Sequence, residues 1–159
     1  KRGKRMDECI AIVKGLCAGG YFEFKGEFYD LPPVKINPLP PKPLPILVGG
    51  FADAALKRAA RHDGFLYAGG GPEYIWAVLN KLHQFRAEAG TQDKPYRIFA
   101  SGVSDFSPDH LARLAEAGVT DVAVVFRNLY AIEEDREPLA DKIDALKRFA
   151  DTVIAQAQG

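Results

Sequence analysis

The sequence is poor in the residues that build metal sites and disulfide frameworks. Its 159 residues include only two cysteines and three histidines, and the histidines are scattered. Cys9 and Cys17 fall on one expected helix, where their spacing separates them by about 12 Å along the axis. Because a disulfide needs Cα atoms within about 7 Å, we expect two free, buried thiols and no metal centre. Reduced thiols suit a cytoplasmic protein.

An excess of charge of either sign is also missing. Lysine plus arginine and aspartate plus glutamate both number 21, so the formal net charge is zero. Binding to nucleic acid or to an anionic membrane surface requires a basic excess, so we expect neither partner. No apolar run approaches the roughly 20 residues that cross a bilayer. The start has no signal-peptide core and no initiating methionine, so we expect the chain to begin inside a longer one.

What the sequence does contain is an alternation of apolar strands and amphipathic helices. A helix over residues 1–20 and an aromatic and proline-rich excursion over 21–45 precede four strand–helix units over 46–159, together one domain. Strands are expected at 45–48, 65–68, 97–100 and 122–126, and helices behind them at 52–61, 72–90, 107–118 and 138–156. This alternation predicts an α/β fold with a parallel sheet.

The apolar spacing predicts which helix faces are buried. In order along the chain, the inward residues are expected to be Met6, Ile10, Val13 and Cys17, then Ile75, Leu79, Leu82 and Phe85, then Leu111, Leu114 and Ala115, and finally Leu139, Ile143, Leu146, Ala150, Val153 and Ile154. The excursion differs because its many prolines prevent a helix. A hairpin turn is expected at residues 25–27, and the excursion either packs on the surface through its aromatic side chains or forms a lid over a site.

Glycines follow the first two expected strands directly. Val48-Gly49-Gly50 and Ala68-Gly69-Gly70 each lead from a strand into a helix. Glycine there allows a tight turn, and it also allows an anion to approach the backbone N–H groups at a helix start. The carboxyl ends of parallel strands lie at one edge of a sheet, where such folds bind ligands. Both interpretations, tight turns and a phosphate cradle, are open at this point.

Other polar and aromatic residues have structural interpretations beside functional ones. Ser101 and Arg127 follow strands, and each could face a ligand or simply be a turn residue and a surface charge. His62 suits a helix cap, whereas His83 and His110 are expected to be exposed on helices. Trp76 is expected to pack near a helix start. None of these residues is assigned as a general acid or base, so the catalytic residues are unknown.

Several motifs taken together resemble a known family. They are Asp7-Glu8, Phe24-x-Gly26-x-Phe28-Tyr29, Pro45-Ile46-Leu47-Val48-Gly49-Gly50, Ala59-Ala60-Arg61-His62-Asp63-Gly64-Phe65 and Leu114-Ala115-Glu116-Ala117-Gly118-Val119. In this order they are similar to the C-terminal half of the bacterial luciferase-like monooxygenases, and most similar to the branch that uses the deazaflavin coenzyme F420 in place of FMN. The resemblance covers essentially the whole chain.

The resemblance implies a fold, a cofactor and a site. The four strands would be strands 5–8 of a TIM-type (β/α)₈ barrel, with the ring-binding half supplied by strands outside this sequence. The chain would be part of a flavin- or F420-dependent oxidoreductase acting on a small-molecule substrate. The resemblance implies that the cofactor phosphate touches Val48, Gly49 and Gly50 after one strand, and Ala68, Gly69 and Gly70 after the next.

Two other hypotheses remain beside this one. The chain could be a non-catalytic half-barrel that binds a phosphorylated ligand, or that completes its barrel with a second copy or with the missing half in trans, since an open sheet leaves unpaired edges. It could also be an unrelated doubly wound α/β domain. The strand order discriminates between the last hypothesis and the barrel, because a doubly wound sheet has a switch point.

Overall fold

A four-stranded parallel sheet forms the centre of the protein. The computed structural model describes residues 1–71, 73–126 and 132–155. The strands are β3 (Leu47–Gly49), β4 (Gly64–Ala68), β5 (Arg97–Ser101) and β6 (Asp121–Val122), and they lie side by side in that order. The predicted parallel α/β fold is thus confirmed. The order follows the chain without a reversal, so the described sheet has no switch point of the kind that a doubly wound sheet has.

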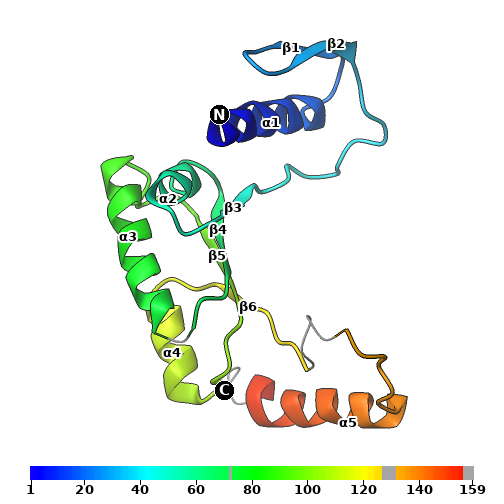
Figure 1. Cartoon of the computed structure of the whole chain (residues 1–159), viewed down its shortest axis with the longest axis vertical. Helices are drawn as coiled ribbons and strands as arrows, with labels where there is room; N and C mark the ends of the chain where they lie inside the picture. The colour runs from blue at the N-terminus through cyan, green and yellow to red at the C-terminus, as the bar shows by residue number, and fades with distance from the viewer. Residues whose placement is uncertain (72, 127–131, 156–159) are drawn as a thin grey trace.

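One face of the sheet is covered by helices. Figure 1 shows α2 (Asp53–Ala59), α3 (Tyr74–Glu88) and α4 (Pro108–Glu116) together on this side. Alternate strand residues point toward them, because successive side chains of a strand face opposite ways. The buried residues of this layer include Val48, Phe65, Tyr67, Ile98 and Ala100 from the strands and Leu56, Ile75, Leu79, Leu82 and Leu114 from the helices. The inward face predicted for α3 is confirmed.

The opposite face of the sheet is less well covered. Leu66, which points away from the three helices, is 37% exposed. The last helix, α5 (Leu139–Phe149), continues as a π-helical turn over Ala150–Ile154 and lies on the other side of the sheet from α2–α4 (Figure 1).

The inward face predicted for the last helix is wrong. No residue of α5 is buried, and Leu139 and Leu146 are 71% and 55% exposed. The helix is instead held near its end, where the Phe149 ring meets Phe106 and Phe126 edge to face with centroids 5.1 and 5.6 Å away. Amphipathic spacing predicted the apolar stripe correctly, but the described residues bring no layer against it.

The fourth strand is shorter than predicted. The sequence suggested 122–126, whereas β6 is Asp121–Val122. The Ala123 N–H still donates to the Ala100 carbonyl at 2.7 Å, and the chain then leaves the sheet. Phe126 is about half exposed, with its ring against Phe149. β6 is the edge of the described sheet, so no neighbour on its outer side extends the pairing.

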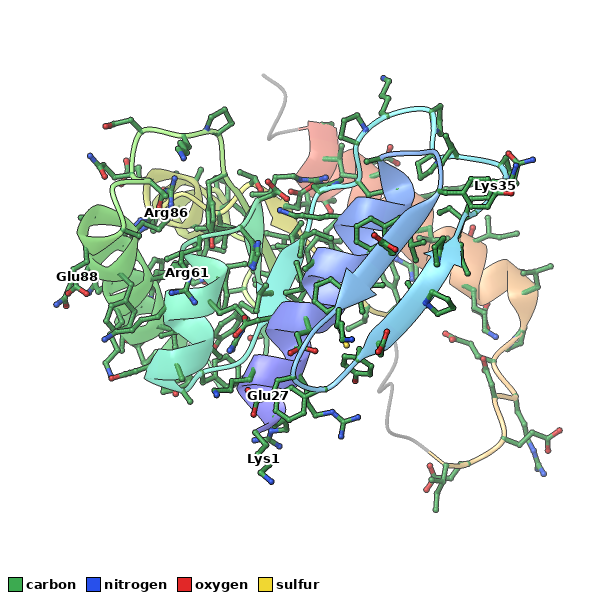
Figure 2. The ribbon with its side chains drawn as sticks, turned by 90° about the horizontal axis from the view of Figure 1, so that it is seen from above. Lys1, Glu27, Lys35, Arg61, Arg86 and Glu88 are labelled. Carbon is green, nitrogen blue, oxygen red and sulfur yellow. The ribbon has the colours of Figure 1, made fainter. Side chains whose placement is uncertain are left out.

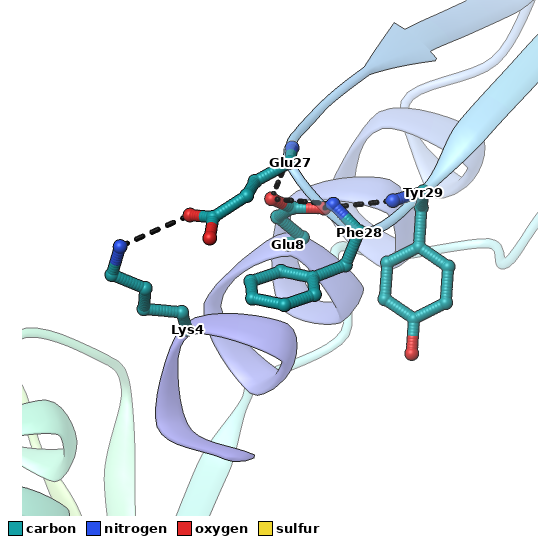
Figure 3. Close-up of polar contacts among 5 residues, drawn as sticks. All are labelled: Lys4, Glu8, Glu27, Phe28 and Tyr29. Atoms are coloured by element: carbon teal, nitrogen blue, oxygen red, sulfur yellow. Dashed lines mark hydrogen bonds and ion pairs between the residues drawn. The ribbon is translucent and has the colours of Figure 1, made fainter. Parts of the chain in front are cut away.

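The first part of the chain forms a helix and a hairpin. Helix α1 (Arg2–Cys17) is followed by β1 (Phe22–Lys25) and β2 (Asp30–Val34), which pair antiparallel around the predicted turn. The Glu8 carboxylate of α1 accepts hydrogen bonds from the N–H groups of Glu27, Phe28 and Tyr29 at 2.7, 3.0 and 3.1 Å (Figure 3). The Lys4 ammonium adds an ion pair to Glu27 at 3.0 Å. The turn is therefore fastened to the helix by backbone donors.

Burial on α1 differs from the prediction. Only Ile10 is buried, and Met6 is 50% exposed. Cys9 and Cys17 are free, as expected, but only half buried. Viewed from above, the hairpin lies over α1 (Figure 2), and the Phe22 ring occupies the place where a side chain at Gly15 would stand. The helix therefore meets the hairpin, reaches α2 through the Asp7–Arg58 ion pair and joins the core through Ile10, and the rest of its apolar stripe is partly in solvent.

Candidate functional site

The predicted site residues lie at neighbouring strand ends. Val48 and Gly49 belong to β3 and Gly50 follows it, whereas Ala68 ends β4 and Gly69 and Gly70 follow that strand. Gly49 pairs with Leu66, so the two glycine turns leave the same edge of the sheet. The side chain of Val48 is part of the buried core, so only its backbone is available to a ligand.

Some of these glycines are tightly packed, whereas one is open to a ligand. A Cβ at Gly50 would lie 2.9 Å from the Ala55 methyl, and one at Gly70 would lie 2.6 Å from the Tyr74 ring. These two glycines are thus required by close packing. A Cβ at Gly69 would meet nothing within 4 Å, although the φ angle of +95° favours glycine. Of these turn residues, Gly69 therefore combines a left-handed backbone with an open approach.

Three aromatic rings pack against one another next to the turns. Phe51 contacts both Tyr67 and Tyr74 edge to face, with ring centroids 5.4 Å apart in each pair. Burial raises the pKa of Tyr67, which keeps the phenol protonated, and its hydroxyl donates to the Gly71 carbonyl at 3.2 Å. Sequence reasoning missed this cluster. Strand alternation could have placed Tyr67 inward, but only tertiary structure brings the three rings together.

A small cleft lies beside these turns, and the loop after β5 forms one of its walls. Its lining includes Tyr67, Gly71, Gly102, Ser104 and His110. His110 is only 16% exposed, so the prediction of an exposed histidine is wrong. α4 carries this imidazole against the core, where its ring meets the edge of Trp76 at 5.9 Å between centroids. Trp76 packs as predicted.

An acidic side chain stands next to His110. Asp105 accepts a hydrogen bond from the Ser107 N–H at 2.8 Å, and this bond lowers the pKa of the carboxyl group. The other carboxylate oxygen lies 3.8 Å from Nδ1 of His110. The cleft thus has a carboxylate and an imidazole side by side at the carboxyl end of β5. This pairing could not be seen in the sequence, where both residues sit in an unremarkable loop and helix start.

The remaining candidates lie elsewhere or serve the fold. Nδ1 of His62 is buried without a hydrogen-bond partner, so the predicted capping role is wrong, and burial lowers the pKa of this imidazole. His83 is also not exposed as predicted, because its Nε2 lies 2.9 Å from the Ala117 carbonyl. Ser101 donates to the Tyr67 carbonyl at 3.1 Å. Arg127 lies outside the described residues.

The described residues contain neither a metal-binding cluster nor a membrane-spanning helix. Within residues 1–71, 73–126 and 132–155, no three histidine, cysteine, aspartate or glutamate side chains are grouped so that they could hold a metal ion. Among the helices described, none has the length and apolar character needed to cross a bilayer.

These features define a parallel α/β protein with glycine turns at adjacent strand ends. Residues 1–157 match the family described as luciferase-like monooxygenase. The chain belongs to this family, which confirms the resemblance read from its motifs.

The chain is similar to several curated proteins. It is 51% identical over 156 residues to the uncharacterized protein Rv0940c of Mycobacterium tuberculosis (strain ATCC 25618 / H37Rv), a match covering 98% of this chain and 54% of that protein. It is 31% identical to the F420-dependent glucose-6-phosphate dehydrogenase of Microbacterium testaceum (strain StLB037), over 69% of this chain and 34% of that enzyme. It is 23% identical to the pyrimidine monooxygenase RutA of Acinetobacter baylyi (strain ATCC 33305 / BD413 / ADP1), over 71% of this chain and 32% of that enzyme.

The chain spans about half the length of the mycobacterial relatives it matches.

Proposed function

We propose that this chain is the part of a flavin- or F420-dependent oxidoreductase that holds the cofactor phosphate at the carboxyl ends of β3 and β4. The observation that carries the proposal is the open, left-handed turn at Gly69 beside the glycine turn of β3. Backbone N–H groups at such turns attract anions because their dipoles converge. A phosphate fits there, since a Cβ at Gly69 would meet no protein atom within 4 Å.

The chain's own residues would bind and orient the cofactor. The backbone of Val48, Gly49 and Gly50 and that of Ala68, Gly69 and Gly70 would surround the phosphate, with the aromatic cluster holding both turns in place. When bound, the cofactor supplies hydride chemistry, together with oxygen activation in the case of a flavin. F420 is named in the description of the glucose-6-phosphate dehydrogenase relative, whereas FMN is what the resemblance to the luciferase-like monooxygenases implies.

We further propose that β3–β6 form strands 5–8 of a (β/α)₈ barrel. The uninterrupted strand order and the helices on one face support this arrangement. The relatives are about twice as long as this chain, which leaves room for four more strand–helix units. The ring of the cofactor and the substrate would then meet residues outside this sequence.

The cofactor proposal is tested by titrating the purified chain with FMN and with F420 and following absorbance and fluorescence. We expect one of them to bind with micromolar affinity. Gly69→Val should weaken that binding by about tenfold, or about 1.4 kcal/mol. The matched control is Gly90→Val, because Gly90 also has a positive φ (+64°) and open surroundings but follows α3 at the far end of the helix. A folded chain that binds neither cofactor would refute the proposal for this chain.

A second function is favoured by the apolar residues left in solvent. The exposed Leu66 on the sheet and the exposed stripe of α5 suit a half-barrel that is covered by another copy or by a partner, with or without catalysis. Sedimentation at micromolar concentration tests this alternative, because it predicts a dimer or larger species. A monomer that unfolds cooperatively would contradict it.

A further inference from the structure

The turn after β5 touches the turn after β4 without any side chain between them. Gly102 has a φ of +76°, and a Cβ built there would lie 3.2 Å from Cα and 3.8 Å from N of Gly69. We propose that Gly102 is a positioning residue, which sets the place of the Gly69 turn and thereby the affinity of the site for a phosphate-bearing cofactor. This inference rests on the proposed function and adds a third loop to the cradle.

The register of β4 against β5 places the two turns side by side. Ala68 pairs with Ser101, the last residues of β4 and β5, so Gly69 and Gly102 leave the sheet as neighbours. The Ser101 hydroxyl donates to the Tyr67 carbonyl at 3.1 Å, which ties the two strand ends together immediately before the turns. Contact between the two glycines therefore follows from the pairing of the strands.

The Gly69 turn is held from two sides and open on a third. The absence of a side chain at Gly102 leaves room for the Cα of Gly69, because a Cβ there would lie 3.2 Å from it, and the Tyr67 hydroxyl holds the end of the turn through the Gly71 carbonyl at 3.2 Å. The direction in which a Cβ of Gly69 would point is empty. A ligand can approach the turn from that open side, and the position of the turn depends on the Tyr67 hydrogen bond and on the space left at Gly102.

A methyl group at residue 102 would displace this turn. A Cβ at residue 102 would lie 3.2 Å from the Cα of Gly69, which is closer than most contacts that Cβ atoms make in proteins. Because this neighbour is a backbone atom, the Gly69 turn must move by a few tenths of an ångström. Hydrogen bonds weaken steeply outside a narrow range of distance and angle, so several phosphate contacts would loosen at once. We expect Gly102→Ala to weaken binding of FMN or F420 by about tenfold, which is about 1.4 kcal/mol.

The control variant Gly90→Ala distinguishes displacement of the Gly69 turn from general backbone strain. Gly90→Ala imposes the same kind of left-handed strain at a site with open surroundings, so both variants should melt below the wild type, and Gly102→Ala should melt lower because of its contact with Gly69. Only Gly102→Ala should change the dissociation constant, and Gly90→Ala should stay within about twofold of the wild type. Equal affinities in the two variants would overturn the inference.

A second variant covers the case in which Gly102→Ala does not fold. Tyr67→Phe removes the hydroxyl that holds Gly71 and adds no atom, so it should loosen the same turn and weaken cofactor binding by about threefold. Unchanged affinity in Tyr67→Phe would show that the position of the Gly69 turn does not control cofactor binding, and this would overturn the inference. The two proposals fail differently. Weakened binding in Gly69→Val with wild-type affinity in Gly102→Ala refutes this inference alone, whereas a folded wild-type chain that binds neither cofactor refutes both.

Discussion

Removal of the Glu8 carboxylate should release the hairpin from α1. Its two oxygens accept from three consecutive backbone N–H groups at 2.7–3.1 Å, those of Glu27, Phe28 and Tyr29 (Figure 3). The Glu8→Ala variant leaves these donors without their acceptor. Glu8→Gln keeps one acceptor oxygen and should show an intermediate effect.

The expected magnitude follows from the number and setting of the bonds. Hydrogen bonds to a charged group are worth about 1.5–3 kcal/mol each when buried, and this site is only half buried, so we expect a total loss of about 2–3 kcal/mol for Glu8→Ala. For a domain of this size the loss corresponds to a fall of about 4–12 °C in Tm. Glu8→Gln should lose about half as much free energy, because an amide offers one acceptor oxygen.

The assay combines thermal melting with hydrogen exchange of peptides covering residues 21–34. Glu8→Ala should speed exchange in the turn at 27–29 more than in α3, because the bonds that it removes are local. Glu23→Ala is the matched control, since it removes the same kind of side chain from an exposed position on the same hairpin. If Glu8→Ala matches Glu23→Ala in both Tm and exchange, the carboxylate does not hold the turn.

Two further predictions concern stability. Arg86 is 7% exposed, stacks on Tyr96 and donates from Nη2 to the carbonyls of residues 91, 92 and 94. Arg86→Ala should therefore lower the free energy of unfolding, measured in urea, by about 2–4 kcal/mol. A loss no larger than that of Arg2→Ala, which removes an exposed arginine, would contradict this. The Arg58 guanidinium holds the pKa of Asp7 below 3.8, so the pair stabilises the fold above that pH and the contribution is lost as pH falls through the lowered pKa. Between pH 7 and pH 3, Asp7→Asn should lose less stability than the wild type in thermal melts. The difference between the two losses should be less than about 1 kcal/mol because the pair is partly exposed. Equal losses would exclude this role.

Local patterns in the sequence were enough to predict the elements and the class of fold. Helical spacing placed α3 and its buried face, and the glycine pairs marked where β3 and β4 end. These signals are reliable because burial of one helix face and the φ demands of a turn act on residues close in sequence. The family could be read from the motifs for the same reason, since they are contiguous.

Only the tertiary structure decided which apolar stripes are covered and which loops touch. The stripe of α5 has the same spacing as that of α3, yet it stays exposed because burial depends on the layer opposite and not on the stripe itself. Contact between Gly69 and Gly102 depends on the register of β4 against β5, two segments more than thirty residues apart. The cleft arises in the same way, because Tyr67 and Gly71 at the end of β4 line it together with Gly102 after β5. Spacing along the chain determined the elements, and pairing across it determined the site.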